Sequence, residues 1–190
     1  MNFAHKANIA QRVFKSLVFG QVPNYAIVYV DGRCNMHCSF CCYAAMDARN
    51  SSNIMPADWG NTFKRAKSLL HLTITGGEPF LRKDLTEIIS EIIQNSGVPR
   101  VSIKSNGFYL KRIKELGLVL DLNVRSYTKE ANEPYLSEPW LRVAIREEIK
   151  IALGDDSHGV MNVGQYLEEG VAFLRKLGGK TKWAKPSLWE

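Results

Sequence analysis

Three cysteines form the most distinctive chemical feature of this sequence. Cys34, Cys38 and Cys41 follow the spacing C-x3-C-x2-C, so three thiols lie within one short stretch. Cysteine thiolates are the usual ligands of iron–sulfur clusters, and a loop this compact is able to wrap one cluster. Because a cubane cluster has four irons, three protein ligands leave one iron open to a small molecule. The spacing therefore predicts a [4Fe–4S] site.

A zinc site is the main alternative for these cysteines. Zinc prefers four tetrahedral ligands, usually in two separated pairs, and no second pair exists in the chain. His37 lies inside the same tight loop, where it is the remaining candidate for a fourth zinc ligand. Cys42 directly follows Cys41, and the side chains of adjacent residues diverge. We therefore interpret Cys42 as a packing residue, or as a residue that contacts the cluster ligands, rather than as a ligand itself.

Two further motifs each follow a short apolar run. Gly76-Gly77-Glu78-Pro79 comes after residues 71–75, and Ser105-Asn106-Gly107 comes at the end of residues 101–105. Glycines let the backbone approach a ligand closely, and a carboxylate or a backbone carbonyl accepts hydrogen bonds from an ammonium group. Either motif alone also fits an ordinary turn after a strand.

Taken together and in this order, these motifs resemble the radical S-adenosylmethionine (SAM) superfamily over about residues 24–117. The resemblance implies that Cys34, Cys38 and Cys41 bind the [4Fe–4S] cluster and that Phe40 lies near the adenine of SAM. It also implies reductive cleavage of SAM to a 5′-deoxyadenosyl radical, an electron donor such as flavodoxin or ferredoxin, and a substrate that the sequence does not identify. The residues that it assigns to the SAM site are Gly76, Gly77, Glu78, Pro79, Ser105 and Asn106.

The elements that must position these motifs alternate between strand and helix. Apolar and β-branched runs predict buried strands, apolar on both faces, at 25–30, 71–75, 101–105, 119–124 and 149–153. A helical apolar period predicts helices at 2–19, 57–70, 85–94, 109–116, 140–148 and 163–177.

This alternation predicts an α/β fold with parallel strands, in which ligands collect at the carboxyl ends of the strands. The cysteine loop and the two other motifs would meet at that edge. A complete eight-unit barrel needs about 250 residues, and this chain has 190. We therefore expect a partial (β/α) barrel or an open parallel sheet flanked by helices. We expect a single domain with a helical extension over 1–23, a radical SAM-like half over 24–117 and further β/α units over 118–190.

The last of these segments resembles the end of histidinol phosphatases of the polymerase-and-histidinol-phosphatase (PHP) family, through Leu153–Val160 and neighbouring short motifs. The resemblance implies that Asp156 and His158 bind a divalent metal, although the His-x-His motif of that family is absent. Three hypotheses follow: a radical SAM enzyme or enzyme core, a non-catalytic iron–sulfur fragment or chimera, and a PHP-type metal-dependent histidinol phosphatase.

Composition and charge bear on which partners and which cellular compartment we expect. The net charge is +6 and the pI about 9.2, but the basic residues are scattered and accompany no nucleic-acid-binding motif, so we expect no nucleic-acid partner. No apolar run approaches the roughly 20 residues that a membrane span needs. All four cysteines fall between Cys34 and Cys42, which favours metal chemistry in a reducing compartment. We therefore expect a cytoplasmic protein.

Overall fold

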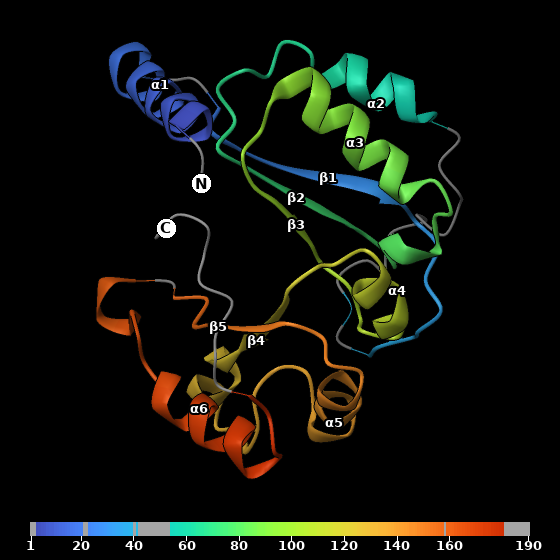
Figure 1. Cartoon of the computed structure of the whole chain (residues 1–190), viewed down its shortest axis with the longest axis vertical. Helices are drawn as coiled ribbons and strands as arrows, with labels where there is room; N and C mark the ends of the chain where they lie inside the picture. Colours follow the sequence, from blue (N-terminus) through green and yellow to red (C-terminus); the bar gives the residue numbers. More distant parts are fainter. Residues whose placement is uncertain (1–2, 21–22, 40, 42–53, 158, 181–190) are drawn as a thin grey trace. The chain divides into compact units, whose positions relative to one another are not determined.

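The computed structural model describes residues 3–20, 23–39, 41, 54–157 and 159–180. Two compact units divide the chain, Met1–Asn106 and Gly107–Glu190. Strands and helices alternate through both units (Figure 1). In chain order the elements are α1 (Phe3–Phe19), β1 (Tyr25–Asp31), α2 (Pro56–Phe63), β2 (His71–Gly76), the 3-10 helix η1 (Pro79–Leu81), α3 (Leu85–Ser96), β3 (Val101–Ile103), α4 (Leu110–Glu115), β4 (Leu120–Asn123), the 3-10 helix η2 (Val124–Lys129), α5 (Glu138–Arg146), β5 (Ile151–Gly154), the 3-10 helix η3 (Val160–Asn162) and α6 (Leu167–Lys176).

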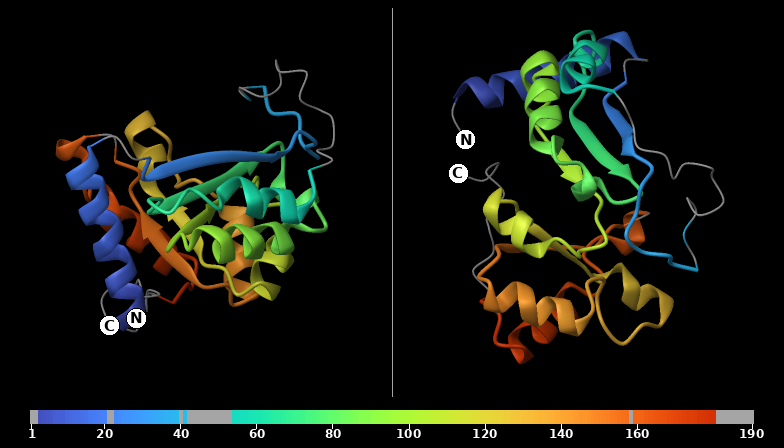
Figure 2. Two further views of the ribbon diagram at one scale, coloured as in Figure 1. Left: turned by 90° about the horizontal axis from the view of Figure 1, so that it is seen from above. Right: turned by 90° about the vertical axis from the view of Figure 1, so that its right-hand side faces the viewer.

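The first unit is a three-stranded parallel sheet with the strand order β1-β2-β3. Tyr25 is paired with His71 at the start of β1, and Leu72 is paired with Val101 at the start of β3. Helices α2 and α3 lie side by side over one face of the sheet (Figures 1 and 2). The core includes fully buried apolar side chains from β1, β2 and α3, namely Val30, Leu72, Ile74, Leu85, Ile88 and Ile92.

A buried arginine joins helix α1 to the rest of the first unit. The Arg12 guanidinium donates hydrogen bonds to the carbonyls of Leu69, Ser96 and Gly97, each at 2.8 Å. The last two carbonyls belong to the carboxyl end of α3, where helix carbonyls have no partners within the helix. A positive charge at this end also interacts favourably with the negative end of the helix dipole. Arg12 therefore supplies both the hydrogen bonds and the charge that the end of α3 needs.

The second unit has a separate core. Strands β4 and β5 pair in parallel, with Leu122 opposite Leu153. Helices α5 and α6 contribute the buried Leu141 and Leu174, which pack with Leu122 and Leu177. The left-handed backbone of Gly117 (φ 62°) follows α4, as expected for a glycine just after a helix.

The predicted fold class is confirmed: this is an α/β protein with parallel sheets flanked by helices. Three element predictions need correction. The helix predicted at 57–70 ends at Phe63. Turns follow it, in which the Ala66 N–H donates to the Phe63 carbonyl, and the N–H groups of Leu70 and His71 then donate to the Asn24 carbonyl beside β1. The helix predicted at 163–177 begins only at Leu167, because η3 and a turn at Gly164 (φ 80°) precede it.

The third correction concerns β1, predicted as a strand buried on both faces. Tyr25, Ile27 and Tyr29 alternate along β1 and are each about half exposed, at 47%, 51% and 52%. The reason is that β1 is the edge strand of its sheet and that α2 and α3 cover one face only (Figure 2). Within the described residues, no helix is long and apolar enough to cross a membrane.

Candidate functional site

The carboxyl ends of β1 and β2 are joined by backbone hydrogen bonds at the start of the GGEP turn. The Gly77 N–H donates to the Asp31 carbonyl at 2.9 Å, and the Glu78 N–H donates to the Arg33 carbonyl at 2.8 Å. A Cβ atom at Gly77 would lie 2.2 Å from the Arg33 carbonyl oxygen, so only glycine fits this approach. The turn after β2 is therefore seated directly against the residue that precedes Cys34.

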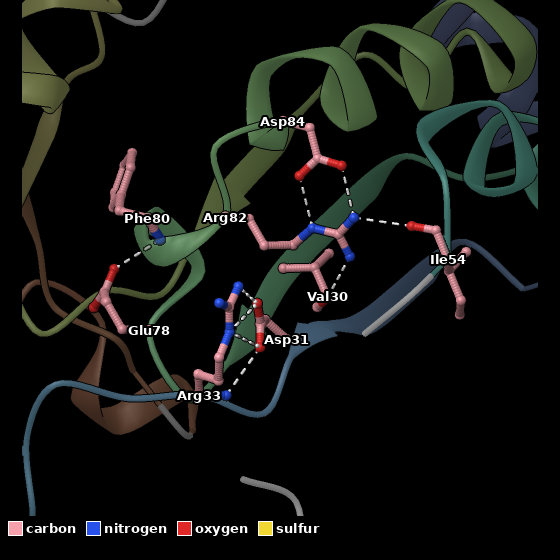
Figure 3. Close-up of polar contacts among 8 residues, drawn as sticks. All are labelled: Val30, Asp31, Arg33, Ile54, Glu78, Phe80, Arg82 and Asp84. Carbon is pink, nitrogen blue, oxygen red and sulfur yellow. Dashed lines mark hydrogen bonds and ion pairs between the residues drawn. The ribbon is translucent and has the colours of Figure 1, made fainter. Parts of the chain in front are cut away.

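Glu78 connects this turn to the end of β3. Its carboxylate is fully buried and accepts from the Phe80 N–H at 3.0 Å, within the turn itself (Figure 3). It also accepts from the Ser105 hydroxyl at 3.1 Å and from the Asn106 N–H at 2.8 Å. A buried carboxylate is tolerated only when such donors replace water. Glu78 therefore fixes Ser105 and Asn106 relative to the GGEP turn.

Asn106 completes the link back to the cysteine loop. Its amide Nδ2 donates to Asn35 Oδ1 at 2.9 Å and lies 3.8 Å from Cys34 Sγ. The prediction that the cysteine loop, GGEP and Ser-Asn-Gly meet at one edge of the sheet is thus confirmed by contacts among all three segments. The predicted roles of Gly76, Gly77, Glu78, Pro79, Ser105 and Asn106 as SAM ligands stay predictions.

The cysteine loop presents accessible thiols. Cys34 is exposed, Cys38 and Cys41 are half-buried, and all three are free thiols. The Cys41 N–H donates to the Cys38 carbonyl at 3.1 Å, which forms a turn between these two cysteines. Among the described residues, no three His, Cys, Asp or Glu side chains are gathered around a common point. The donor set nevertheless fits an iron–sulfur cluster, because three free thiols share one accessible loop at the strand ends.

Two charged groups that the sequence analysis did not single out support this edge of the sheet. The buried Asp31 carboxylate forms an ion pair with Arg33 at 2.6 Å (Figure 3). Burial by itself raises the pKa of the Asp31 carboxyl. Hydrogen bonds from Arg33 and the positive charges of Arg33 and Arg82 outweigh burial and hold this pKa below its ordinary value. The only sequence signal was the Asp-Gly-Arg run between an apolar strand and Cys34, and a charge at such a strand end needs a partner.

Arg82 is the other support that the sequence analysis missed. Its side chain is buried beside β1 and forms an ion pair with Asp84 at 2.7 Å. Pro79, which was predicted to be part of the SAM site, is buried at the start of η1. Phe40, Cys42 and His158 lie outside the described residues.

Asp156, one of the two residues predicted to bind a divalent metal, follows β5 in the second unit. The Asp155 carboxylate accepts a hydrogen bond from the Gly164 N–H at 2.5 Å, and this bond lowers the pKa of Asp155. The Asp156 carbonyl accepts from Arg125 at 3.0 Å. Within the described part of the chain, Asp156 belongs to no group of three potential metal ligands. The PHP resemblance stays a prediction.

Comparison with known proteins agrees with the family resemblance of the three motifs. The profile of the Radical SAM superfamily matches residues 28–178, so the match continues through β4, β5 and α6. Probable GTP 3′,8-cyclase of Metallosphaera sedula is 36% identical over 104 residues, which are 51% of this chain and 32% of that protein. GTP 3′,8-cyclase of Aquifex aeolicus is 31% identical over 115 residues, which are 53% of this chain and 35% of that protein. The chain thus spans about a third of the length of these relatives.

Solved structures share the fold. The crystal structure of SuiB of Streptococcus suis bound to S-adenosylmethionine superposes with a TM-score of 0.52 at 18% identity, over 92% of this chain and 43% of that one. SuiB bound to the precursor peptide SuiA gives a TM-score of 0.51. The structure therefore has a parallel α/β fold with three free thiols in one loop at its strand ends. Because the family profile matches most of the sequence, the chain belongs to the radical SAM superfamily.

Proposed function

We propose that this protein binds a [4Fe–4S] cluster through Cys34, Cys38 and Cys41 and cleaves SAM reductively. One observation carries the proposal: Glu78 and Asn106 join the ends of β2 and β3 to the loop that bears the thiols. When bound, the cluster supplies the electron that breaks a C–S bond of SAM. A reducing compartment would keep the three thiols available.

The chain's own residues would bind and orient SAM. The Glu78 carboxylate already accepts hydrogen bonds from three donors of the chain, and a carboxylate offers about four acceptor positions. We therefore assign Glu78 mainly to positioning. The backbone carbonyls of the Gly76–Gly77 turn would accept hydrogen bonds from the ammonium group of SAM, and Asn106 would act beside Cys34.

A nucleotide is the first substrate class to test. Relatives with more than 30% identity over half of this chain are named GTP 3′,8-cyclases. GTP would therefore be tested first, and a peptide would be tested second because SuiB binds a precursor peptide at a similar fold. A tested compound is identified as a substrate if its addition increases the rate at which SAM is consumed.

The decisive experiment reconstitutes the protein anaerobically with iron and sulfide, then adds SAM and a chemical reductant. We expect a brown protein, about four irons per chain, and the appearance of methionine and 5′-deoxyadenosine. Cys38→Ala should bind less iron and form no 5′-deoxyadenosine. Cys42→Ala is the matched control, because we interpret Cys42 as a packing residue, and it should keep both properties.

Each result distinguishes the hypotheses. A cluster without 5′-deoxyadenosine would favour the non-catalytic iron–sulfur protein. Colourless protein that takes up zinc in place of iron would refute the proposal. An equal loss of cluster in Cys42→Ala and Cys38→Ala would refute the assignment of the three ligands.

A further inference from the structure

We infer that Arg82 is a positioning residue that closes the base of the cysteine loop and thereby governs how firmly the cluster is held. The inference rests on the proposed function, since it concerns the loop that carries Cys34, Cys38 and Cys41. It assigns to Arg82 no contact with the cluster or with SAM. It is carried by the contacts of one buried guanidinium with the two ends of that loop.

The two ends of the loop are bonded to the same side chain (Figure 3). Arg82 Nη1 donates to the Val30 carbonyl at 2.9 Å, at the carboxyl end of β1. Arg82 Nη2 donates to the Ile54 carbonyl at 2.9 Å, two residues before α2. Every cysteine of the chain lies between Val30 and Ile54. One guanidinium therefore brings together the backbone before and after all of the thiols.

A carboxylate holds the guanidinium in this orientation. Arg82 Nε and Nη2 donate to the two Asp84 carboxylate oxygens at 2.9 and 2.7 Å. This bidentate pairing fixes the plane of the guanidinium and directs its remaining donors towards the two carbonyls. Arg82 directly follows η1 and Asp84 directly precedes α3, so the pair lies between two helical elements.

Lysine is unable to reproduce this arrangement. The guanidinium presents five N–H donors in a planar fork, whereas an ammonium group is a compact point charge with three donors. A lysine at position 82 would keep the charge but would not reach two carbonyls and both carboxylate oxygens together. The loop ends would separate more often, and the ligands would lose the restraint that favours rebinding of a released iron.

The chain offers a closely matched control. Arg12 is as buried as Arg82, both at 5% exposure. It also donates to backbone carbonyls, but these are Leu69, Ser96 and Gly97, outside the cysteine loop. Arg12→Lys therefore makes the same chemical change at equal burial. Any effect of general destabilisation should appear in both variants, whereas a loop effect should appear only in Arg82→Lys.

Two measurements test the inference. Release of iron from the reconstituted protein to a chelator, followed anaerobically by visible absorbance, should be on the order of tenfold faster in Arg82→Lys than in Arg12→Lys, given the strength of charged hydrogen bonds. Amide hydrogen exchange of the cluster-free protein should be faster around residues 31–34 and 54–56 in Arg82→Lys alone. Asp84→Asn, which leaves the arginine in place, should change both readouts in the same direction by a smaller factor.

Equal iron-release rates in Arg82→Lys and Arg12→Lys would overturn the inference and leave the proposed function intact. Unchanged hydrogen exchange at both loop ends would also overturn it. If the wild-type protein bound no cluster, the proposed function would fail, and the exchange measurement would still decide whether Arg82 closes the loop. If Arg82→Lys failed to fold, Asp84→Asn would decide by the same two readouts.

Discussion

Among the residues of the site, Glu78 combines complete burial with several donors from distant parts of the chain. The Ser105 hydroxyl and the Asn106 N–H both depend on its carboxylate. Breaking such a buried arrangement leaves donors without acceptors, which costs more than the hydrogen bonds themselves contribute. Glu78 is thus expected to matter for folding as well as for binding.

We predict that Glu78→Gln lowers the free energy of unfolding by about 1–3 kcal/mol. The amide has one acceptor oxygen where the carboxylate has two, and its NH2 group faces the Asn106 N–H or the Phe80 N–H. Ser105→Ala, which removes one donor and keeps the charge, should cost less. Urea unfolding of the cluster-free variants measures both values, and a Glu78→Gln protein as stable as the wild type would contradict this role.

His71 gives a pH-dependent prediction at the same scale. Burial, followed by the positive charges of Arg100 and Lys104, lowers the pKa of His71, and its Nε2 lies 2.8 Å from the Ser102 hydroxyl oxygen. Both folded and unfolded chains hold His71 neutral above the ordinary pKa. As the pH falls, the unfolded chain takes up the proton first, so stability is lost.

The unfolding free energy should therefore fall between about pH 8 and about pH 5.5, and it should fall less in His71→Gln. Urea titrations of both proteins at the two pH values provide the comparison. Because the other histidines are present in both proteins, the difference isolates His71. An identical pH dependence in the two proteins would rule out its contribution.

The candidate site residues that could be predicted from the sequence are those that lie in short, recognisable motifs. Cysteine spacing and the GGEP and Ser-Asn-Gly motifs were readable because the residue types themselves are diagnostic. The roles of Asp31 and Arg82 could not be predicted, because they depend on burial and on hydrogen-bond partners that only the folded chain brings close. An arginine on a loop looks like a solvated charge until its carbonyl partners are known.

At the scale of elements, the close approach of the GGEP turn to the cysteine loop determines the geometry of the site. We predict that Gly77→Ala disrupts it, since the new Cβ would lie 2.2 Å from the Arg33 carbonyl oxygen. Backbone atoms have to move, so cluster content after reconstitution should fall severalfold and stability by about 1–3 kcal/mol. Gly159→Ala, whose Cβ would meet its nearest atom at 3.6 Å, is the control.

Iron content and thermal unfolding of the two alanine variants measure these effects. Normal iron content in Gly77→Ala would mean that the turn and the cysteine loop shift apart without harm. Loss of iron in Gly159→Ala would show that the assay reports something other than local crowding.

Element types were predictable where the apolar period was long, as in α1 and α3. Element ends were less predictable, because tertiary hydrogen bonds decide them. Helix α2 ends at Phe63 although its apolar pattern continues. The chain turns between Phe63 and Leu69, and the amides of Leu70 and His71 then donate to the Asn24 carbonyl rather than within a longer helix. The exposure of β1 was missed because an apolar strand looks the same in a central position and at an edge.

At the scale of the whole molecule, two units with separate cores make up the chain. We predict that Leu174→Ala, which opens a cavity in the core of the second unit, destabilises that unit by about 2–5 kcal/mol. Amide exchange should accelerate in α6 and β5, whereas α3 should keep its protection. Mass spectrometry of exchanged peptides would measure this, and equal acceleration in α3 would contradict separate cores.

The parallel pairing of β1 with β2 has a consequence for synthesis. Tyr25 pairs with His71, which is synthesised 46 positions later in the chain. Because a ribosome adds roughly 5–20 residues per second, β1 stays unpaired for several seconds after its synthesis. During that interval the apolar strand has unpaired backbone groups and is able to pair with another chain. Its apolar residues are Tyr25, Ile27, Val28 and Tyr29. A holdase that binds the unpaired strand would cover it during this interval, so co-expression of a holdase should raise the yield of folded chain.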